Sequence, residues 1–318
     1  MSADPVLADH RELESGELAE VLRLIDSATD TDGVSPVSEH VLLHLRHGGD
    51  GEAHNLLVHD DGGALTGYAH LDLTDLVGGG AAELVVSPEH RRGGLGAHLV
   101  HALEEFTTDG RLRLWAHGRT PGARALAERL GYRQARVLFQ LRRSLLSGLP
   151  AVDVPQGVTI RPFVVGQDEQ VWTDVNNRAF ADHPDQGGWS LNQIQTREKE
   201  PWFDPEGFLL AVDDEDRLLG FHWTKVHGGG HEHPGSGAHA HEPIGEVYAL
   251  GVDPGAQGRG LGPVLTAAGL RYLRGLGLSQ VMLYVDESNA GAVRLYEKLG
   301  FTHWDLDVSY RRPGPDGG

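Results

Sequence analysis

The chain repeats itself, and this repeat limits its possible folds more than any other feature of the sequence. Three blocks of residues recur in the same order, with offsets of 153, 166 and 169 residues between the two copies. The blocks are LTGYAHLDL (65–73) and LLGFHWTKV (218–226), LVVSP (84–88) and LGVDP (250–254), and RLGYR (129–133) and KLGFT (298–302). Drifting offsets are expected for two copies of one fold that differ in loop insertions. The sequence therefore predicts two tandem domains of one architecture.

Length and composition exclude several classes of protein. A chain of 318 residues suits about two domains. It has no cysteine, which excludes disulfides, thiolate metal sites and a cysteine nucleophile. A net charge of −19 disfavours nucleic acid as a partner, because phosphate binding needs clustered Lys and Arg. No apolar run approaches the roughly 18–20 residues of a membrane helix, and the acidic N-terminus does not resemble a secretory signal. We expect a cytoplasmic monomer that acts on small molecules, without nucleic-acid or membrane partners.

Each copy has the pattern of a mixed α/β domain. Apolar spacing predicts helices at 18–28 and 171–180, each followed by two strand-like runs that an Asp/Gly turn joins into a hairpin. A third strand, a glycine-rich phrase, a helix, a fourth strand and a short closing helix come next. The segment 144–163 contains Pro and Gly, so we expect the domain boundary near residue 150, with domains at 1–145 and 152–318. The expected fold class is α/β (α+β), with a mixed, mostly antiparallel sheet flanked by helices in each domain.

The glycine-rich phrases RRGGLG (91–96) and QGRGLG (257–262) predict an anion site in each copy. Each stands between a strand and a helix, where successive backbone N–H groups and the positive end of the helix dipole can face an anion. Glycine permits the tight backbone and leaves room for the ligand. Arginines at 91, 92 and 259 add positive charge. The spacing matches neither the phosphate loop of P-loop NTPases nor the dinucleotide fingerprint of dehydrogenases.

The same motifs resemble the GNAT superfamily of N-acetyltransferases. R-x-x-G-x-G at 91–96 and Q-x-x-G-x-G at 257–262 look like its acyl-CoA pyrophosphate loop, and N-x-x-A-x-x-x-Y-x-x-x-G-F at 289–301 is similar to its last conserved block. Four longer phrases, AFADHPDQGGW, GFHWTKVH, GEVYALGVDP and LYVDESNAGAVRLYEKLGF, resemble a two-domain branch of the superfamily. That branch transfers acetyl from acetyl-CoA to the cysteinyl amine of Cys-GlcN-inositol, the last step of mycothiol biosynthesis. The resemblance covers nearly the whole chain.

The resemblance implies contacts with acetyl-CoA at the third strand and the glycine phrase of both copies. In the first copy the implied residues are Leu84, Val85, Val86, Arg92, Gly93, Gly94, Leu95, Gly96 and Ala97. In the second copy they are Leu250, Gly251, Val252, Gln257, Gly258, Arg259, Gly260, Leu261, Gly262, Pro263, Tyr284, Asn289, Ala290, Gly291, Ala292, Val293 and Arg294. No metal ligand is predicted, and acetyl-CoA is the only implied cofactor.

Glu246 and Tyr296 are the candidates for proton transfer. Glu246 stands four residues before Leu250, which would place both on one face of a regular strand, where a carboxylate could accept the proton of an amine. Tyr296 stands in the closing helix, where a phenol could protonate the CoA thiolate. Spacing alone also fits a solvent-facing Glu and a packing Tyr. The resemblance favours a catalytic base and acid, because both positions match those proposed for the family.

The resemblance also implies contacts between the polar acceptor and five side chains. These are Glu39, Asp185, Lys225, Glu246 and Tyr284. A solvated surface charge is the alternative for each charged residue taken alone.

The first copy lacks the proposed proton-transfer groups. The repeat offsets place Gly80 at the position of Glu246, Ala127 at that of Tyr296 and Thr120 at that of Asn289. Glu83 is near Gly80 and could replace the missing carboxylate. In a regular strand, however, its distance from Gly80 would point it to the opposite face. We expect the first copy to bind CoA without catalysis.

Two other functions and one other site stay open at this stage. The chain could acetylate a different amine, such as a peptide N-terminus or an aminoglycoside, or it could be a non-enzymatic acyl-CoA sensor. The segment 227–243 holds five histidines among Gly, Ser and Pro, which fits either a metal tract or, as we prefer, a flexible hairpin loop.

Overall fold

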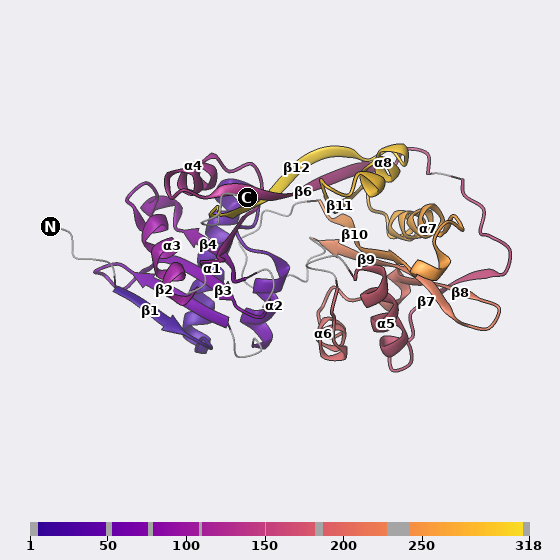
Figure 1. Cartoon of the computed structure of the whole chain (residues 1–318), viewed down its shortest axis with the longest axis horizontal. Coiled ribbons are helices and arrows are strands. Elements are labelled where there is room, and N and C mark those ends of the chain that lie inside the picture. Colours follow the sequence, from indigo (N-terminus) through magenta and orange to yellow (C-terminus); the bar gives the residue numbers. More distant parts are fainter. Residues whose placement is uncertain are drawn as a thin grey trace. The chain divides into compact units, whose positions relative to one another are not determined.

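The computed structural model describes residues 6–48, 53–75, 79–107, 110–149, 151–181, 187–227 and 242–313. The chain divides into two compact units (Figure 1). The N-terminal unit covers Met1–Leu138 and Asp305–Gly318, and the C-terminal unit covers Phe139–Trp304.

The N-terminal unit is a sheet with helices on both faces. Its strands lie in the order β1-β2-β3-β4-β5-β12. Helices α1 and α2 pack on one face over Leu57, Tyr68 and Val85, and α3 packs on the other face over Leu56, Ala69 and Leu71. The elements are β1 (Val6–His10), α1 (Ser15–Asp32), α2 (Glu39–His47), β2 (Ala53–His59), β3 (Leu65–Asp72), β4 (Ala81–Val86), η1 (Pro88–His90), α3 (Leu95–Phe106), β5 (Arg113–Ala116), α4 (Pro121–Arg129) and the later part of β12 (Thr302–Arg311).

The C-terminal unit repeats this layout. Its strands lie in the order β6-β11-β10-β9-β8-β7, with α5 over an aromatic cluster on one face and α7 and α8 on the other. Its elements are the later part of β6 (Arg133–Ser144), β7 (Val158–Pro162), α5 (Glu169–Ala179), α6 (Leu191–Arg197), η2 (Pro205–Gly207), β8 (Phe208–Asp213), β9 (Leu218–His227), β10 (Ile244–Val252), η3 (Pro254–Ala256), α7 (Leu261–Gly275), β11 (Gln280–Asp286) and α8 (Ala290–Lys298).

A strand from the end of the chain completes the N-terminal unit, whereas the C-terminal unit is one contiguous segment. Residues 308–311 of β12 pair with β5, so the end of the chain completes the N-terminal sheet. The later part of β6 lies next to β11 and belongs to the C-terminal unit. The units therefore differ from the expected domains at 1–145 and 152–318. The repeated blocks end where β6 and β12 begin, so they do not indicate which sheet each of these strands joins.

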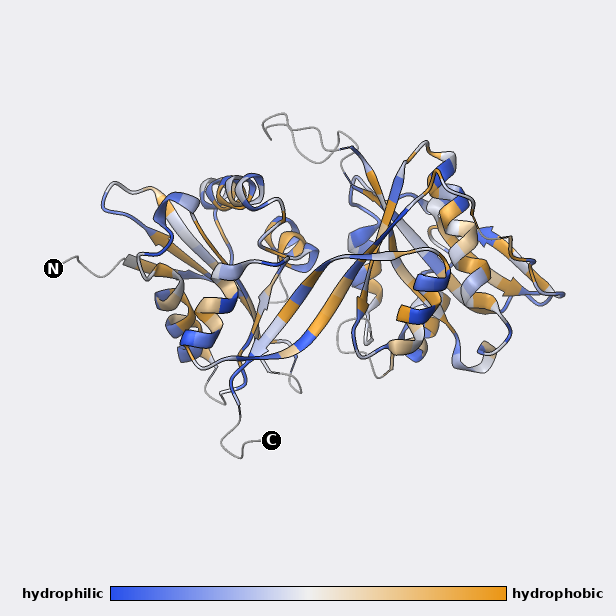
Figure 2. Ribbon diagram, turned by 90° about the horizontal axis from the view of Figure 1, so that it is seen from above, coloured by the Kyte–Doolittle hydropathy of each residue, from blue (hydrophilic) through white to orange (hydrophobic). Residues whose placement is uncertain are grey.

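The helices and hairpins follow the predicted pattern. The predicted helix at 18–28 lies in α1, and the one at 171–180 matches α5 except for its last residue. The two predicted hairpins are the antiparallel pairs β2–β3 and β8–β9. Figure 2 shows helices with hydrophobic residues along one side and hydrophilic residues along the other, as packing on a sheet requires. None of the described helices is long and apolar enough to cross a bilayer.

Candidate active site

The two glycine phrases adopt the same backbone. Gly94 and Gly260 precede the first residues of α3 and α7 with φ of 95° and 77°, in the left-handed region that glycine tolerates. Arg92 and Gly258 are also left-handed, with φ of 66° and 78°. No side chain caps either helix. The backbone N–H groups of both first turns therefore face outward from a positive helix end, which is the geometry of an anion site.

The central strands of both sheets separate just before these loops. β4 is paired in parallel with β5 at residues 81–82, and β10 with β11 at residues 245–246. Among the described residues, no pairing with β5 or β11 continues along the rest of β4 or β10. The backbone at 84–86 and 250–252 therefore has one edge that does not join the neighbouring parallel strand, and it can donate hydrogen bonds to a ligand there.

A cavity of about 870 Å³ occupies this opening in the N-terminal unit. Its size lies within the ~300–1,000 Å³ of small-molecule sites. β4, β5, the glycine loop and α4 form its walls, so it brings together residues that are far apart in the sequence. The predicted contacts that line it are Leu84, Val85, Val86, Arg92, Gly94, Gly96 and Ala97.

Arg91 contributes less positive charge to this loop than its position suggests. Its guanidinium forms a two-pronged ion pair with Asp32, at 2.7 and 2.8 Å, and also donates to the carbonyl of Val86. Arg91 therefore ties the loop to α1 and to the end of β4, and Arg92 is the nearer candidate for a phosphate group.

A β-bulge in β10 changes where Glu246 points. Glu246 pairs with Lys225 and Leu250 pairs with His222, and the register shifts between Val247 and Ala249. Lys225 and His222 are three residues apart on β9, so they lie on opposite faces. The prediction that Glu246 and Leu250 share a face is wrong, because one extra residue in the bulge reverses the alternation.

Glu246 faces the side of the sheet where α5 packs, in a setting of aromatic and charged groups. Its carboxylate contacts the imidazole of His227, with Glu246 Oε2 2.6 Å from His227 Nε2. On the same face, the ammonium group of Lys225 lies 4.4 Å from the ring centre of Trp202 and 5.7 Å from that of Tyr248. Glu246 and Lys225 are both buried. A largely desolvated carboxylate and an imidazole side by side are suited to proton transfer.

His227 is a candidate site residue that the sequence analysis missed. It ends β9 two residues after Lys225, and residues two apart on a strand share a face. That spacing in the phrase GFHWTKVH was the signal that could have identified it.

Tyr296 lies in α8 and is buried among apolar side chains. Its ring packs edge-to-face on Phe301 with 5.6 Å between centres. Burial raises the pKa of Tyr296 to about 12. The phenol is therefore protonated at neutral pH, as a proton donor must be.

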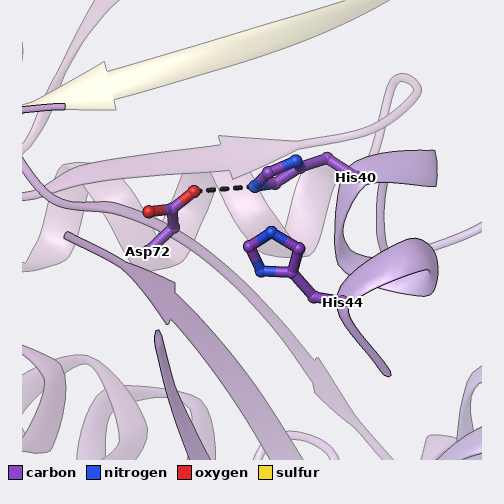
Figure 3. A group of neighbouring side chains, drawn as sticks. All are labelled: His40, His44 and Asp72. Atoms are coloured by element: carbon purple, nitrogen blue, oxygen red, sulfur yellow. Dashed lines mark hydrogen bonds and ion pairs between the residues drawn. The ribbon is translucent and has the colours of Figure 1, made fainter. Parts of the chain in front are cut away.

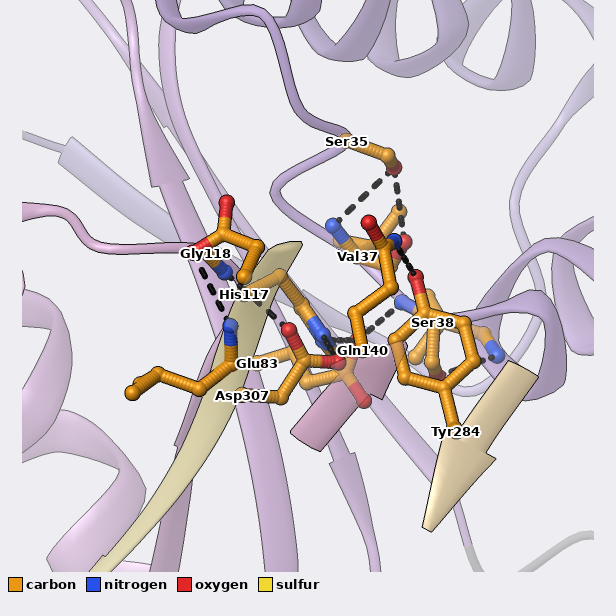
Figure 4. A network of polar contacts seen from close by, with 12 residues as sticks. Ser35, Val37, Ser38, Glu83, His117, Gly118, Gln140, Tyr284 and Asp307 are labelled. Carbon is orange, nitrogen blue, oxygen red and sulfur yellow. Dashed lines mark hydrogen bonds and ion pairs between the residues drawn. The ribbon is translucent and has the colours of Figure 1, made fainter. Parts of the chain in front are cut away.

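The remaining predicted residues of the C-terminal unit have different surroundings. The side chain of Asn289 caps α8 by accepting a hydrogen bond from the backbone of Ala292. Tyr284 is partly exposed on β11, and its hydroxyl accepts a hydrogen bond of 2.7 Å from Gln140 (Figure 4). Asp185 lies outside the described residues.

The N-terminal unit has an alanine where the C-terminal unit has Glu246. Ala81 pairs with Asp72 of β3 as Glu246 pairs with Lys225 of β9, so the bulge shifts the counterpart from the predicted Gly80 to Ala81. Ala127 is buried at the position of Tyr296. Glu39, the predicted acceptor contact of this unit, is the first residue of α2 and is half-buried.

Glu83 takes part in a buried network of hydrogen bonds and ion pairs in this unit (Figure 4). It accepts a hydrogen bond from the backbone of Ser38 and lies 3.4 Å from His117 Nε2, while His117 Nδ1 contacts Asp307 at 2.9 Å. Burial opposes ionisation of Glu83, but His117 and Ser38 bring its pKa below the ordinary value. Burial also opposes the charge of His117, yet Glu83 and Asp307 raise its pKa to about 10. A carboxylate stabilised in this way is a weak base.

Glu83 nevertheless faces the same side of its sheet as Glu246 does. It contacts Ser38 at the start of α2, on the face opposite α3, and Glu246 lies on the face opposite α7. The prediction that Glu83 points to the other face is therefore wrong. The reason is again the bulge, which only β10 contains among the strand pairs β3–β4 and β9–β10.

Comparison with known proteins places both units in one family. The model of the acetyltransferase (GNAT) family matches residues 170–301, and that of an acetyltransferase (GNAT) domain matches residues 52–134. A mycothiol acetyltransferase of Acidothermus cellulolyticus is 56% identical over 313 residues, covering 97% of this chain and 95% of its own. One of Geodermatophilus obscurus is 51% identical and covers 98% of this chain and 99% of its own. The chain belongs to the mycothiol acetyltransferase family.

Solved structures share the fold of this chain. A GCN5-related N-acetyltransferase from Sphaerobacter thermophilus has 27% identity and a TM-score of 0.66, over 97% of this chain and 96% of its own. A tandem GNAT protein from the clavulanic acid biosynthesis pathway has 19% identity and a TM-score of 0.69, over 96% and 98%, and shares the fold. The predicted resemblance and the predicted tandem GNAT fold are confirmed. This member of the mycothiol acetyltransferase family is an acetyl-CoA-dependent acyltransferase.

Proposed function

We propose that the C-terminal unit transfers acetyl from acetyl-CoA to the cysteinyl amine of Cys-GlcN-inositol, and that the N-terminal unit binds CoA without catalysis. The observation that carries the division of roles is the pair Glu246 and Tyr296, which has no counterpart in the N-terminal unit although the glycine loop is kept. The acceptor follows from the family, and a cytoplasmic monomer remains our expectation for this reaction.

Four requirements of amine acetylation can be met by residues of the C-terminal unit. The glycine loop at 257–262 holds the pyrophosphate, and backbone N–H groups at 250–252 hold the thioester and stabilise the oxyanion that forms when the amine attacks it. Glu246, in contact with His227, accepts the proton of the amine. When the C–S bond breaks, Tyr296 donates its proton to the thiolate. The transfer is direct, with no covalent enzyme intermediate and no metal ion.

The proposed acceptor contacts are polar, as a pseudo-disaccharide requires. Lys225, Glu246 and the partly exposed Tyr284 supply charge and hydroxyl groups in the C-terminal unit. Glu39 and Asp185 are proposed as further contacts on the basis of the family resemblance. Buried polar groups of this kind discriminate strongly, because an acceptor that lacks the matching group leaves them unpaired.

Turnover with a panel of acceptors tests the proposed substrate. We expect kcat/KM for Cys-GlcN-inositol to exceed that for cysteine methyl ester or GlcN-inositol by on the order of 100-fold or more, because only the full acceptor satisfies the polar groups of the site. Release of free CoA measures the rate. GlcN-inositol serves as the matched control, since it keeps the sugar and inositol but lacks the cysteinyl amine. Equal rates with simple amines would refute the acceptor and leave acetyl transfer intact.

Replacing Tyr296 with Phe tests the proposed acid. We expect kcat to fall by about 100-fold with little change in KM for acetyl-CoA, because the substitution removes only the proton that the thiolate needs. Steady-state kinetics separates the two parameters. Tyr132→Phe is the control, since its hydroxyl contacts Glu104 in the N-terminal unit and should not affect turnover. A rise in KM with unchanged kcat would identify Tyr296 as a binding or packing residue instead.

A further inference from the structure

Two histidines and an aspartate converge in the N-terminal unit, apart from the glycine loop and the cavity. His40 and His44 stand one turn apart on α2, and Asp72 ends β3 (Figure 3). One possible ligand atom from each residue lies within 4.8 Å of those of the other two. His40 Nε2 contacts Asp72 Oδ2 at 2.7 Å, and the two imidazole rings are 4.0 Å apart between centres. Histidines four residues apart on a helix present both rings to one point in space.

The carboxylate of this group is held in place. Asp72 Oδ1 accepts hydrogen bonds from the backbone and the hydroxyl of Thr74, at 2.8 and 2.7 Å, which leaves Oδ2 directed at His40. An oriented carboxylate oxygen is therefore available to a ligand.

A third imidazole, that of His70, contacts His44 and has a buried nitrogen without a hydrogen-bond partner among the described residues. Asn55 donates from its amide nitrogen to two backbone carbonyls, so its Oδ1 must be the acceptor that contacts His70 Nδ1 at 3.2 Å. His70 Nδ1 consequently carries the proton, and Nε2 presents a lone pair. His70 is 1% exposed, and its Nε2 has no partner among the described residues. Its ring stands edge-on to that of His44, with 5.3 Å between centres.

The arrangement has features that are found around metal ions. Histidine ligands of metals typically donate their second ring nitrogen to an oxygen acceptor, as His70 does to Asn55. His70 and Asp72 are two residues apart on β3 and therefore share the face of the sheet that α2 covers. Imidazole with carboxylate is a donor set that suits Zn²⁺ among the divalent metals available to proteins.

We propose that His40, His44 and Asp72 bind a Zn²⁺ ion, with the lone pair of His70 adjacent as a further donor. Two ligands of one tetrahedral zinc lie about 3.3 Å apart, so the His40–Asp72 contact opens by roughly 0.6 Å when the ion replaces the proton between them. The partly exposed His40 side chain can make this movement.

The ion would fasten α2 to the end of β3. α2 has only nine residues and buries two apolar side chains, Val41 and Leu43. Helices this short are marginal without tertiary contacts. A cross-link through two of its side chains stabilises the helix and the position of Glu39, its first residue. The site is independent of the acetyl-transfer steps, so it can be tested without an activity assay.

Zinc binding to the full chain tests this site. Histidines 231, 233, 239 and 241 are first replaced with Ala, because they could also bind metal. After treatment with EDTA and dialysis, this background protein is titrated with Zn²⁺ in competition with a chromophoric chelator, and with Co²⁺ by visible absorption. We expect one Zn²⁺ per chain, an increase in Tm with Zn²⁺, and Co²⁺ bands typical of nitrogen and oxygen ligands. His44→Ala should weaken Zn²⁺ binding by at least about tenfold and abolish the increase in Tm.

Two further variants make the result decisive. His40→Gln changes a partly exposed side chain, so it keeps the fold if His44→Ala does not, and it should also weaken Zn²⁺ binding at least about tenfold. His101→Ala is the matched control, an exposed histidine of α3 in the same unit, and should bind Zn²⁺ as the background protein does. The proposal is overturned if the background protein binds no Zn²⁺, or if His40→Gln and His44→Ala bind it as tightly as His101→Ala.

Discussion

Replacing Glu246 with Gln is expected to lower kcat by about 10² to 10⁴-fold, because the amide keeps the shape of the side chain but cannot accept the proton of the amine. KM for acetyl-CoA should change little, since the glycine loop and the strand end that hold it are untouched. The amide oxygen can still accept a hydrogen bond from His227, so the local structure is preserved. Steady-state kinetics with saturating acceptor measures the effect, and Tm reports on the fold.

The matched control is Glu215→Gln. Glu215 is an exposed carboxylate in the turn between β8 and β9 and contacts Arg217 there. Its removal costs the same charge but should leave turnover unchanged. If Glu246→Gln also keeps wild-type turnover, Glu246 is not the base. If instead the wild-type protein acetylates no acceptor of the panel, a non-enzymatic acyl-CoA sensor becomes the better interpretation.

The substitution Gly260→Val should reduce kcat/KM for acetyl-CoA by on the order of 100-fold, whereas Gly94→Val should leave turnover within about twofold of wild type. Both glycines have left-handed backbones, both precede a helix, and neither has an atom within 4 Å of an added Cβ. Each variant therefore suffers a similar backbone strain of about 1–2 kcal/mol, and each places a side chain where the pyrophosphate is proposed to bind. The two variants differ only in which copy loses its anion site.

Titration calorimetry with acetyl-CoA completes this comparison. Wild-type protein is expected to bind one acetyl-CoA in each unit, and each variant to lose one of them. Equal losses of turnover would mean that the N-terminal loop takes part in the reaction. Unchanged binding in Gly94→Val would mean that the N-terminal cavity does not hold CoA. These experiments use the full chain, because residues 308–311 complete the sheet of the N-terminal unit and a fragment ending at residue 145 lacks them.

Local features were predicted well because they depend on neighbouring residues. The repeated blocks, the hairpins and the helix at each glycine phrase follow from periodicity and from the backbone freedom of Gly94 and Gly260. The face of Glu246 was not predictable in the same way. GEVYALGV alternates like a regular strand, and only its pairing with β9 reveals the extra residue of the bulge.

Contacts between distant residues could not be predicted at all. His117 and Asp307 are 190 positions apart, and nothing near either residue indicates the other. Their contact depends on the C-terminal strand joining the N-terminal sheet. His227 is an intermediate case: its spacing from Lys225 places both on one face of β9, but only the pairing with β10 shows that Glu246 shares that face.

The sequence by itself determined the tandem repeat, the family and the difference between the two copies, because each is carried by residue types at short spacings. Only the tertiary structure decided to which face Glu246 points and which residues contact Glu83. It also brought His40, His44 and Asp72 together. The physical reason is that a bulge, the pairing of β12 with β5 and a side-chain cluster are set by pairing and packing between segments that are remote along the chain.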